Sequence, residues 1–121
     1  MEKNTKDEIR EVKGFLPKAI KFADEINEDF AEGIAEFYQA IWDERENGLS
    51  MKEKHILVFT VACASNNVES ASKILERLKK FGATRTEIYD AMMMAAWTGG
   101  IQNFTNVSSE LVDKINKLGF E

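Results

Sequence analysis

The sequence contains a single cysteine and a single histidine among its 121 residues. One cysteine, Cys63, excludes a disulfide within the chain, which is typical of proteins from the reducing interior of a cell. One histidine, His55, leaves too few ligands for a catalytic zinc ion, which takes about three from the protein. We therefore expect no metal and no cofactor.

Long apolar runs and clusters of basic residues are also missing. No apolar run approaches the roughly 20 residues of a membrane-spanning helix, and no apolar segment of a signal peptide follows residues 1–4. The formal net charge is −5, with alternating signs along the chain, and offers no basic surface to nucleic acid. We expect a cytoplasmic protein that binds neither membranes nor nucleic acid.

Proline and glycine are scarce and fall mainly where helices should end. The chain has one proline and seven glycines, and it has no segment with the period-two alternation of a strand. The predicted helix N-caps are Thr5, Asn27, Ser50, Asn67 and Thr84. We predict an all-α fold of about six or seven helices in one domain, residues 1–121, with a short first helix within residues 1–14.

The stretch from Leu49 to Gly82 reads as two helices joined by a polar turn, and it is the centre of the predicted fold. Residues 56–64 are apolar on nearly every side, which predicts a helix buried at the centre of the domain. Residues 65–67 end this helix and cap the next one. We expect any reaction centre at this turn or in the first turn of the buried helix.

The segment from Met92 to Trp97 is more apolar than a single chain of this length needs. Three consecutive methionines and the tryptophan cover both sides of one predicted helix. A contiguous exposed apolar patch usually marks an interface. We predict a stable oligomer whose interface includes part of this segment.

The order of three motifs resembles the carboxymuconolactone decarboxylase family, which includes the AhpD-like alkylhydroperoxidases. The motifs are Leu49-Ser50-Met51-Lys52-Glu53-Lys54, Phe81-Gly82-Ala83-Thr84-Arg85-Thr86-Glu87-Ile88 and Ala95-Ala96-Trp97-Thr98-Gly99-Gly100, with Phe15-Leu16-Pro17 as a lead-in. The resemblance covers the chain from about Phe15 onward. It implies an all-helical AhpD-like fold and a homo-oligomer, commonly a trimer or hexamer.

The same resemblance implies a set of functional residues, and this chain replaces them. The AhpD-like branch carries Cys-x-x-Cys, a following histidine and an earlier glutamate, which together perform thiol redox chemistry. At the family's spacing the two cysteine positions are Asn67 and Ser70, the histidine position is Ile74, and the glutamate position is His55. The decarboxylase branch keeps the histidine at the position that is Ile74 here.

Cys63 and His55 remain as candidates for chemistry. Cys63 lies within the predicted buried helix, so we expect a small core residue with an inert thiol rather than a peroxidatic one. His55 lies at the start of that helix, where the positive end of the dipole favours a neutral imidazole that accepts protons. The alternative is a partly exposed histidine without chemistry. Of the nearby cations, nothing in the sequence marks Arg77 or Arg85 as buried.

Three functions stay open on these residues. The first is a family member with a small-molecule pocket lined by His55, Asn67, Ser70 and Trp97, with proton transfer on a small carbonyl or lactone compound, His55 as base and Ser70 as a further candidate catalytic residue. The second is a thiol peroxidase that uses Cys63. The third is a noncatalytic binding or assembly protein, in which Asn67 and Ser70 only cap a helix.

Overall fold

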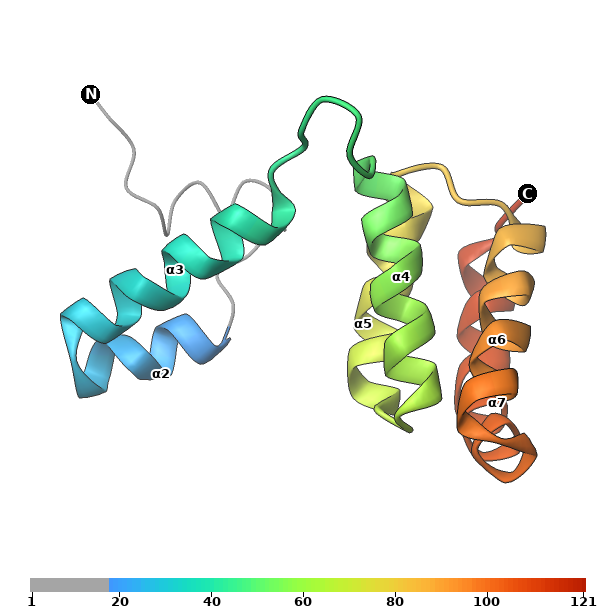
Figure 1. Ribbon diagram of the computed structural model, residues 1–121. Helices are drawn as coiled ribbons and strands as arrows, with labels where there is room; N and C mark the ends of the chain where they lie inside the picture. Colours follow the sequence, from blue (N-terminus) through green and yellow to red (C-terminus); the bar gives the residue numbers. More distant parts are fainter. Residues whose placement is uncertain (1–17) are drawn as a thin grey trace. The chain divides into compact units, whose positions relative to one another are not determined.

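Most of the chain that the structure describes, residues 18–121, is helical. The computed structural model contains α2 (Lys18–Ile26), α3 (Glu28–Trp42), α4 (Met51–Ala64), α5 (Val68–Lys80), α6 (Arg85–Gly99) and α7 (Ile101–Leu118) (Figure 1). Residues 18–121 contain no strand, which confirms the all-α class. None of these helices is both long and apolar enough to cross a membrane. The helix predicted within residues 1–14 lies outside the described residues.

The N-caps predicted from the sequence begin four of these helices. At Ser50 the hydroxyl accepts the backbone N–H of Glu53 at 3.1 Å, and the Glu53 carboxylate accepts the backbone N–H of Ser50 at 2.9 Å. Thr84 forms the same capping box at the start of α6. Asn27 and Asn67 each accept a backbone N–H of the following turn. Since these bonds satisfy donors that a helix start leaves open, local sequence fixes where the helices begin.

Helix α3 ends earlier than its sequence pattern predicts. The apolar spacing after the Asn27 cap predicts a helix from Glu28 to about Arg45. Helix α3 instead ends at Trp42, and Asp43 has extended backbone angles of φ −63° and ψ 134°. The Arg45 guanidinium turns back and donates to the carbonyl oxygen of Ala40 and, at 3.2 Å, to that of Asp43. Arg45 therefore caps the last turn of α3 instead of lengthening the helix.

The chain divides into two compact units, residues 1–46 and 47–121. In the first unit α2 packs against α3 around a small core of Ile20 and Ala35, supported by Tyr38. Ile26, which the pattern of α2 places inward, is 76% exposed. That prediction is wrong because Ile26 is the last residue of the helix, directly before the turn into α3.

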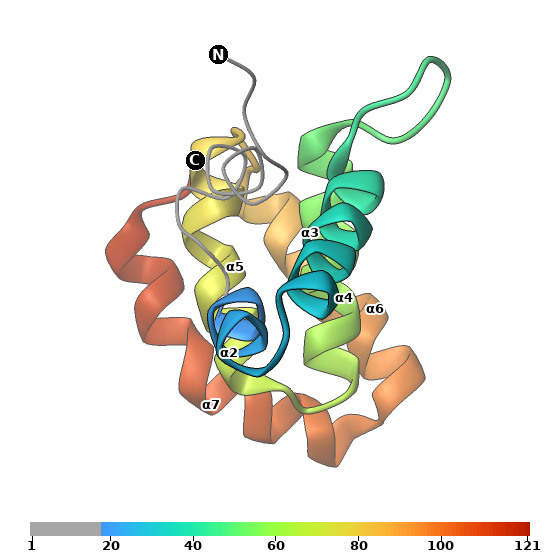
Figure 2. The ribbon, with the colours of Figure 1, turned by 90° about the vertical axis from the view of Figure 1, so that its left-hand side faces the viewer.

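In the second unit α4 packs against α5, α6 and α7, and α7 also packs against α5 and α6. The four helices form two adjacent pairs, α4 with α5 and α6 with α7 (Figures 1 and 2). The largest completely buried apolar side chains between them are Phe59, Leu75, Leu78, Ile88, Val107, Leu111 and Ile115. This core is the scaffold on which the candidate site residues lie.

The composition of α4 predicts a helix that is buried on every side, but the structure buries only one of its faces. Its packed face carries Phe59, Ala62 and Cys63, which are at most 5% exposed. On the opposite face Leu57 is 50% and Val61 is 66% exposed. The prediction is wrong within the second unit because α5, α6 and α7 cover one side of α4 only.

Candidate functional site

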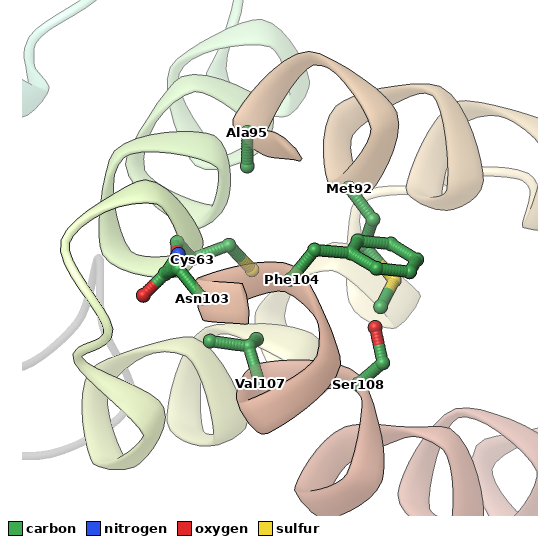
Figure 3. Close-up of a pocket in the computed structure, with 7 residues that line it drawn as sticks. All are labelled: Cys63, Met92, Ala95, Asn103, Phe104, Val107 and Ser108. Atoms are coloured by element: carbon green, nitrogen blue, oxygen red, sulfur yellow. The ribbon is translucent and has the colours of Figure 1, made fainter. Parts of the chain in front are cut away.

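Cys63 lies in the last turn of α4, inside the core of the second unit. Its side chain points into a narrow gap lined by Met92, Phe104 and Val107, and the gap has no room for a water molecule (Figure 3). Burial raises the pKa of the Cys63 thiol to about 12, from an ordinary value of 9.0. The thiolate is the nucleophile of thiol chemistry, so the thiol stays unreactive at neutral pH.

The junction of α6 and α7 holds the C-terminal end of α4. The Asn103 side-chain amide donates to the carbonyl oxygens of Cys63 at 2.6 Å and Ala64 at 3.3 Å. Gly99 lies against the same turn, where a Cβ atom would be only 2.5 Å from the Ala64 carbonyl oxygen. A glycine is therefore required for the two helices to approach this closely.

His55 lies near the start of α4 and is 0% exposed. Its Nδ1 is 2.6 Å from the carbonyl oxygen of Met51, and its ring centroid is 4.8 Å from that of Phe81. Because a carbonyl oxygen can only accept, Nδ1 carries a proton in this contact. The expectation of a partly exposed histidine is wrong, since Phe81 and the core enclose the ring.

The guanidinium of Arg77 lies against the phenyl ring of Phe81. Its guanidinium carbon lies 5.2 Å from the centroid of Phe81. The Nε and Nη2 atoms are buried and have no hydrogen-bond partner among the described residues, and burial lowers the pKa of Arg77. The structure thus brings a cation to the ring that covers His55. Arg77 and Phe81 are neighbours four residues apart at the C-terminal end of α5, whereas the contact of Phe81 with His55 joins two helices and cannot be read from helix spacing.

Asn67 and Ser70 lie at the opposite end of the α4–α5 pair from His55. About 12 residues of helix and turn, roughly 18 Å of helical rise, separate His55 from Asn67 along the chain. Helix α5 begins after Asn67, runs back along α4 and ends before Phe81. Within one chain the structure therefore does not bring His55 to the Asn67–Ser70 turn.

An open hollow lies along the outer side of α4 at this turn. Its volume is about 350 Å³. The lining residues are Leu57, Val58, Val61, Ala62, Ser65, Asn67 and Ser70. Asn67 also caps α5, since its Oδ1 accepts the backbone N–H of Ser70 at 3.2 Å, which leaves the amide NH₂ of Asn67 as a donor.

The Met92–Trp97 segment presents two different faces. Met92 is buried, whereas Met93, Met94 and Trp97 are 58%, 59% and 87% exposed. A second groove of about 320 Å³ lies between α6 and α7 beside Met93. Trp97 is not among the residues that line the α4–α5 hollow, so one chain alone does not place it beside Asn67 and Ser70.

Residues 18–121 contain no group of three or more histidine, cysteine or acidic side chains placed to hold a metal ion. The sequence analysis missed Asn103, and it named Arg77 and Phe81 without placing them beside His55. Asn103 follows the Gly99-Gly100 break by one helical turn, so the break was the available signal for a close contact at this end of α4. No local pattern marks Arg77 or Phe81, because their burial depends on the packing of α5 against α4.

The fold and these positions define a helical domain built around an α4–α5 pair with a capped turn. The profile of the carboxymuconolactone decarboxylase family matches residues 28–113, well over half of the chain. The chain belongs to the carboxymuconolactone decarboxylase family. No curated protein and no solved structure gives a significant match.

Proposed function

We propose that this family member binds a small carbonyl or lactone compound in the α4–α5 hollow and performs no thiol chemistry. The observation that carries the proposal is the hollow of about 350 Å³ at the turn where the resemblance places the paired cysteines. Asn67 and Ser70 occupy those positions. Ligand sites of this kind are mostly apolar with a few placed polar groups, as this hollow is.

The polar groups of the hollow suit a carbonyl oxygen. The amide NH₂ of Asn67 and the hydroxyl of Ser70 are donors, while Leu57 and Val61 supply apolar walls. The Ser65 hydroxyl already donates to the carbonyl oxygen of Val61 at 2.6 Å. None of the seven lining side chains is titratable near neutral pH. These features support binding rather than acid–base catalysis in the hollow.

The thiol peroxidase alternative requires a reactive Cys63, and its surroundings oppose that role. The side chain is 2% exposed, and its pKa is raised to about 12. An intramolecular disulfide is also impossible with one cysteine. These observations favour Cys63 as a core residue.

Proton transfer at His55 is the second candidate function. The contact of Nδ1 with the Met51 carbonyl supports it, because this contact leaves Nε2 as the proton acceptor. Such chemistry requires a substrate to reach a ring that is 0% exposed, so Phe81 would have to move. The hollow needs no such rearrangement, and we therefore rank binding first.

An NMR titration with γ-butyrolactone tests the proposal. We expect the backbone amide signals of Ser65, Asn67 and Ser70 to shift, and Ser70→Ala to weaken binding about fivefold, the effect of one hydrogen bond. Ser109→Ala, an exposed serine of α7, is the matched control and should leave binding unchanged. Shifts centred on His55 and Phe81 would favour the second candidate, and absence of binding at millimolar concentration would refute the first.

A further inference from the structure

The connection between α3 and α4 contains the dipeptide Asn47-Gly48 on an exposed stretch of chain. Helix α3 ends at Trp42 and α4 begins at Met51. The chain has eight asparagines, and Asn47 is the only one that a glycine follows. Residues 43–49 are all exposed. The side-chain amide of Asn47 and the backbone of Gly48 are therefore both open to water.

The backbone at this turn leaves the Gly48 nitrogen free to approach the Asn47 side chain. Asn47 has a φ of 63°, in the left-handed region that asparagine tolerates better than most residues. Within residues 18–121 the backbone N–H of Gly48 donates to no carbonyl oxygen. Glycine also has no Cβ that would obstruct rotation of its nitrogen toward the preceding side chain. These conditions favour attack of that nitrogen on the asparagine amide, a thermolabile group.

The turn between α4 and α5 provides an internal comparison. Asn66 is also exposed and has a φ of 56°. The residue after it is Asn67, whose backbone N–H donates to the carbonyl oxygen of Ala62 at 2.8 Å. Asn67 is further held as the N-cap of α5, since its Oδ1 accepts the backbone N–H of Ser70 at 3.2 Å. The nitrogen that would attack the Asn66 side chain is therefore fixed by a hydrogen bond, whereas that of Gly48 is not.

We propose that Asn47 is a modification site, at which water deamidates the native chain and produces aspartate and isoaspartate. The backbone nitrogen of Gly48 bonds to Cγ of Asn47, the Cγ–Nδ2 bond breaks, and the released ammonia carries away the proton of the Gly48 nitrogen. Water then opens the cyclic succinimide. Cleavage of its C–N bond at Cγ gives aspartate, and cleavage at the main-chain carbonyl carbon gives isoaspartate. No atom is oxidised or reduced.

The reaction changes the connection between the helices without touching a core. Both products add a carboxylate, which takes the formal net charge from −5 to −6. Isoaspartate also inserts one carbon atom into the backbone. The capping box of Ser50 and Glu53 lies beyond the reacting bond, so α4 should still begin at Met51. We therefore expect the modified protein to stay folded and to accumulate as a more acidic form. No residue of the α4–α5 hollow takes part, so the site stands apart from the proposed function.

Tryptic peptide mapping of the full chain, incubated at pH 8 and sampled over time, follows the reaction. Asn47 is the only asparagine of tryptic peptide 46–52, while peptide 55–73 carries Asn66 and Asn67 as the internal control. We expect peptide 46–52 to yield two acidic products, and peptide 55–73 to react at least about tenfold more slowly because its attacking nitrogen is hydrogen-bonded. The isoaspartyl product should accept a methyl group from S-adenosylmethionine through a purified isoaspartyl methyltransferase. A sample digested at time zero corrects for reaction during the digest.

Hydroxylamine and two variants test the intermediate. Hydroxylamine attacks the succinimide and cuts the chain, so the native protein should give fragments 1–47 and 48–121. Gly48→Ala adds a Cβ beside the attacking nitrogen and should slow both reactions at least about tenfold. Asn47→Gly removes the reacting side chain, keeps a residue that adopts positive φ, and should abolish them. Both positions are exposed, so both variants should keep the wild-type circular dichroism.

A synthetic peptide of residues 43–52 supplies the reference rate for an unprotected turn. We expect the native protein to react within about tenfold of this peptide, because residues 43–49 are exposed. A much slower native reaction would show that the fold protects Asn47 and would overturn the proposal. Equal rates in peptides 46–52 and 55–73, or an unchanged rate in Gly48→Ala, would overturn it as well, because the Gly48 nitrogen would then not be decisive.

Discussion

The two ends of the α4–α5 pair differ in what they offer to a ligand. At one end His55 is 0% exposed beneath Phe81, with Arg77 on the same ring. At the other end Asn67 and Ser70 line an open hollow. The end with titratable side chains is closed, and the end that is open carries neutral donors. Acid–base chemistry and ligand access are thus separated in a single chain, which favours binding over catalysis.

The core position of Cys63, in the last turn of α4, predicts the largest effect. We expect a disulfide reagent at pH 8 to label Cys63 in the native protein at least about a hundredfold more slowly than in urea, because labelling requires unfolding. Absorbance of the released thiolate measures the rate. Fast native labelling would contradict the burial and reopen the peroxidase alternative.

Two glycine substitutions test how closely α6 packs against the end of α4 beside the hollow. Gly99→Ala should lower the free energy of unfolding by about 1–3 kcal/mol, because the new Cβ meets the backbone of Ala64. Gly33→Ala is the matched control, since it lies within α3 with nothing within 4 Å of an added Cβ. That change should be neutral or stabilising by up to about 1 kcal/mol. Urea unfolding checks both, and equal effects would refute the close approach.

His55 provides a direct test of the separation between the ends. His55→Leu keeps the volume and burial but removes the Met51 contact, so we expect a loss of less than about 1.5 kcal/mol in stability. Lactone binding in the hollow should not change. Loss of binding in a folded His55→Leu protein would show that the two ends communicate. In wild type, long-range ¹H–¹⁵N spectra should show a proton on Nδ1.

The smallest effect concerns the capping box of α6. The backbone N–H of Thr84 donates to Glu87, and the Lys52 ammonium lies 3.1 Å away; both keep the pKa of the Glu87 carboxyl below its ordinary value of 4.5. A lowered pKa stabilises the fold above pH 4.5, and this contribution is lost as the pH falls through the folded-state value. Because solvent screens the pair, Glu87→Gln should cost no more than about 0.5 kcal/mol at pH 7.

The Glu87→Gln effect should diminish as the pH falls below 4.5. Unfolding curves at pH 7 and pH 3 measure it, with Glu110→Gln on the exposed face of α7 as the control. A cost that is undiminished between pH 7 and pH 3 would assign the effect to side-chain packing instead of charge.

The sequence alone determined the helices and the family. Caps at Asn27, Ser50, Asn67 and Thr84 are local, because each bond joins residues within one turn, and so they can be read from spacing. The motif order likewise identified the family, which the match over residues 28–113 confirms. The predicted single domain and the oligomer stay predictions.

Only the tertiary structure decided which side chains meet and which face solvent. Leu57 and Val61 belong to a run that reads as fully buried, yet α5, α6 and α7 cover just one side of it. One expectation for His55 was a partly exposed ring, but the packing of α5 against α4 encloses it under Phe81. Burial depends on which helices are neighbours, and contacts between residues distant in sequence leave no local pattern.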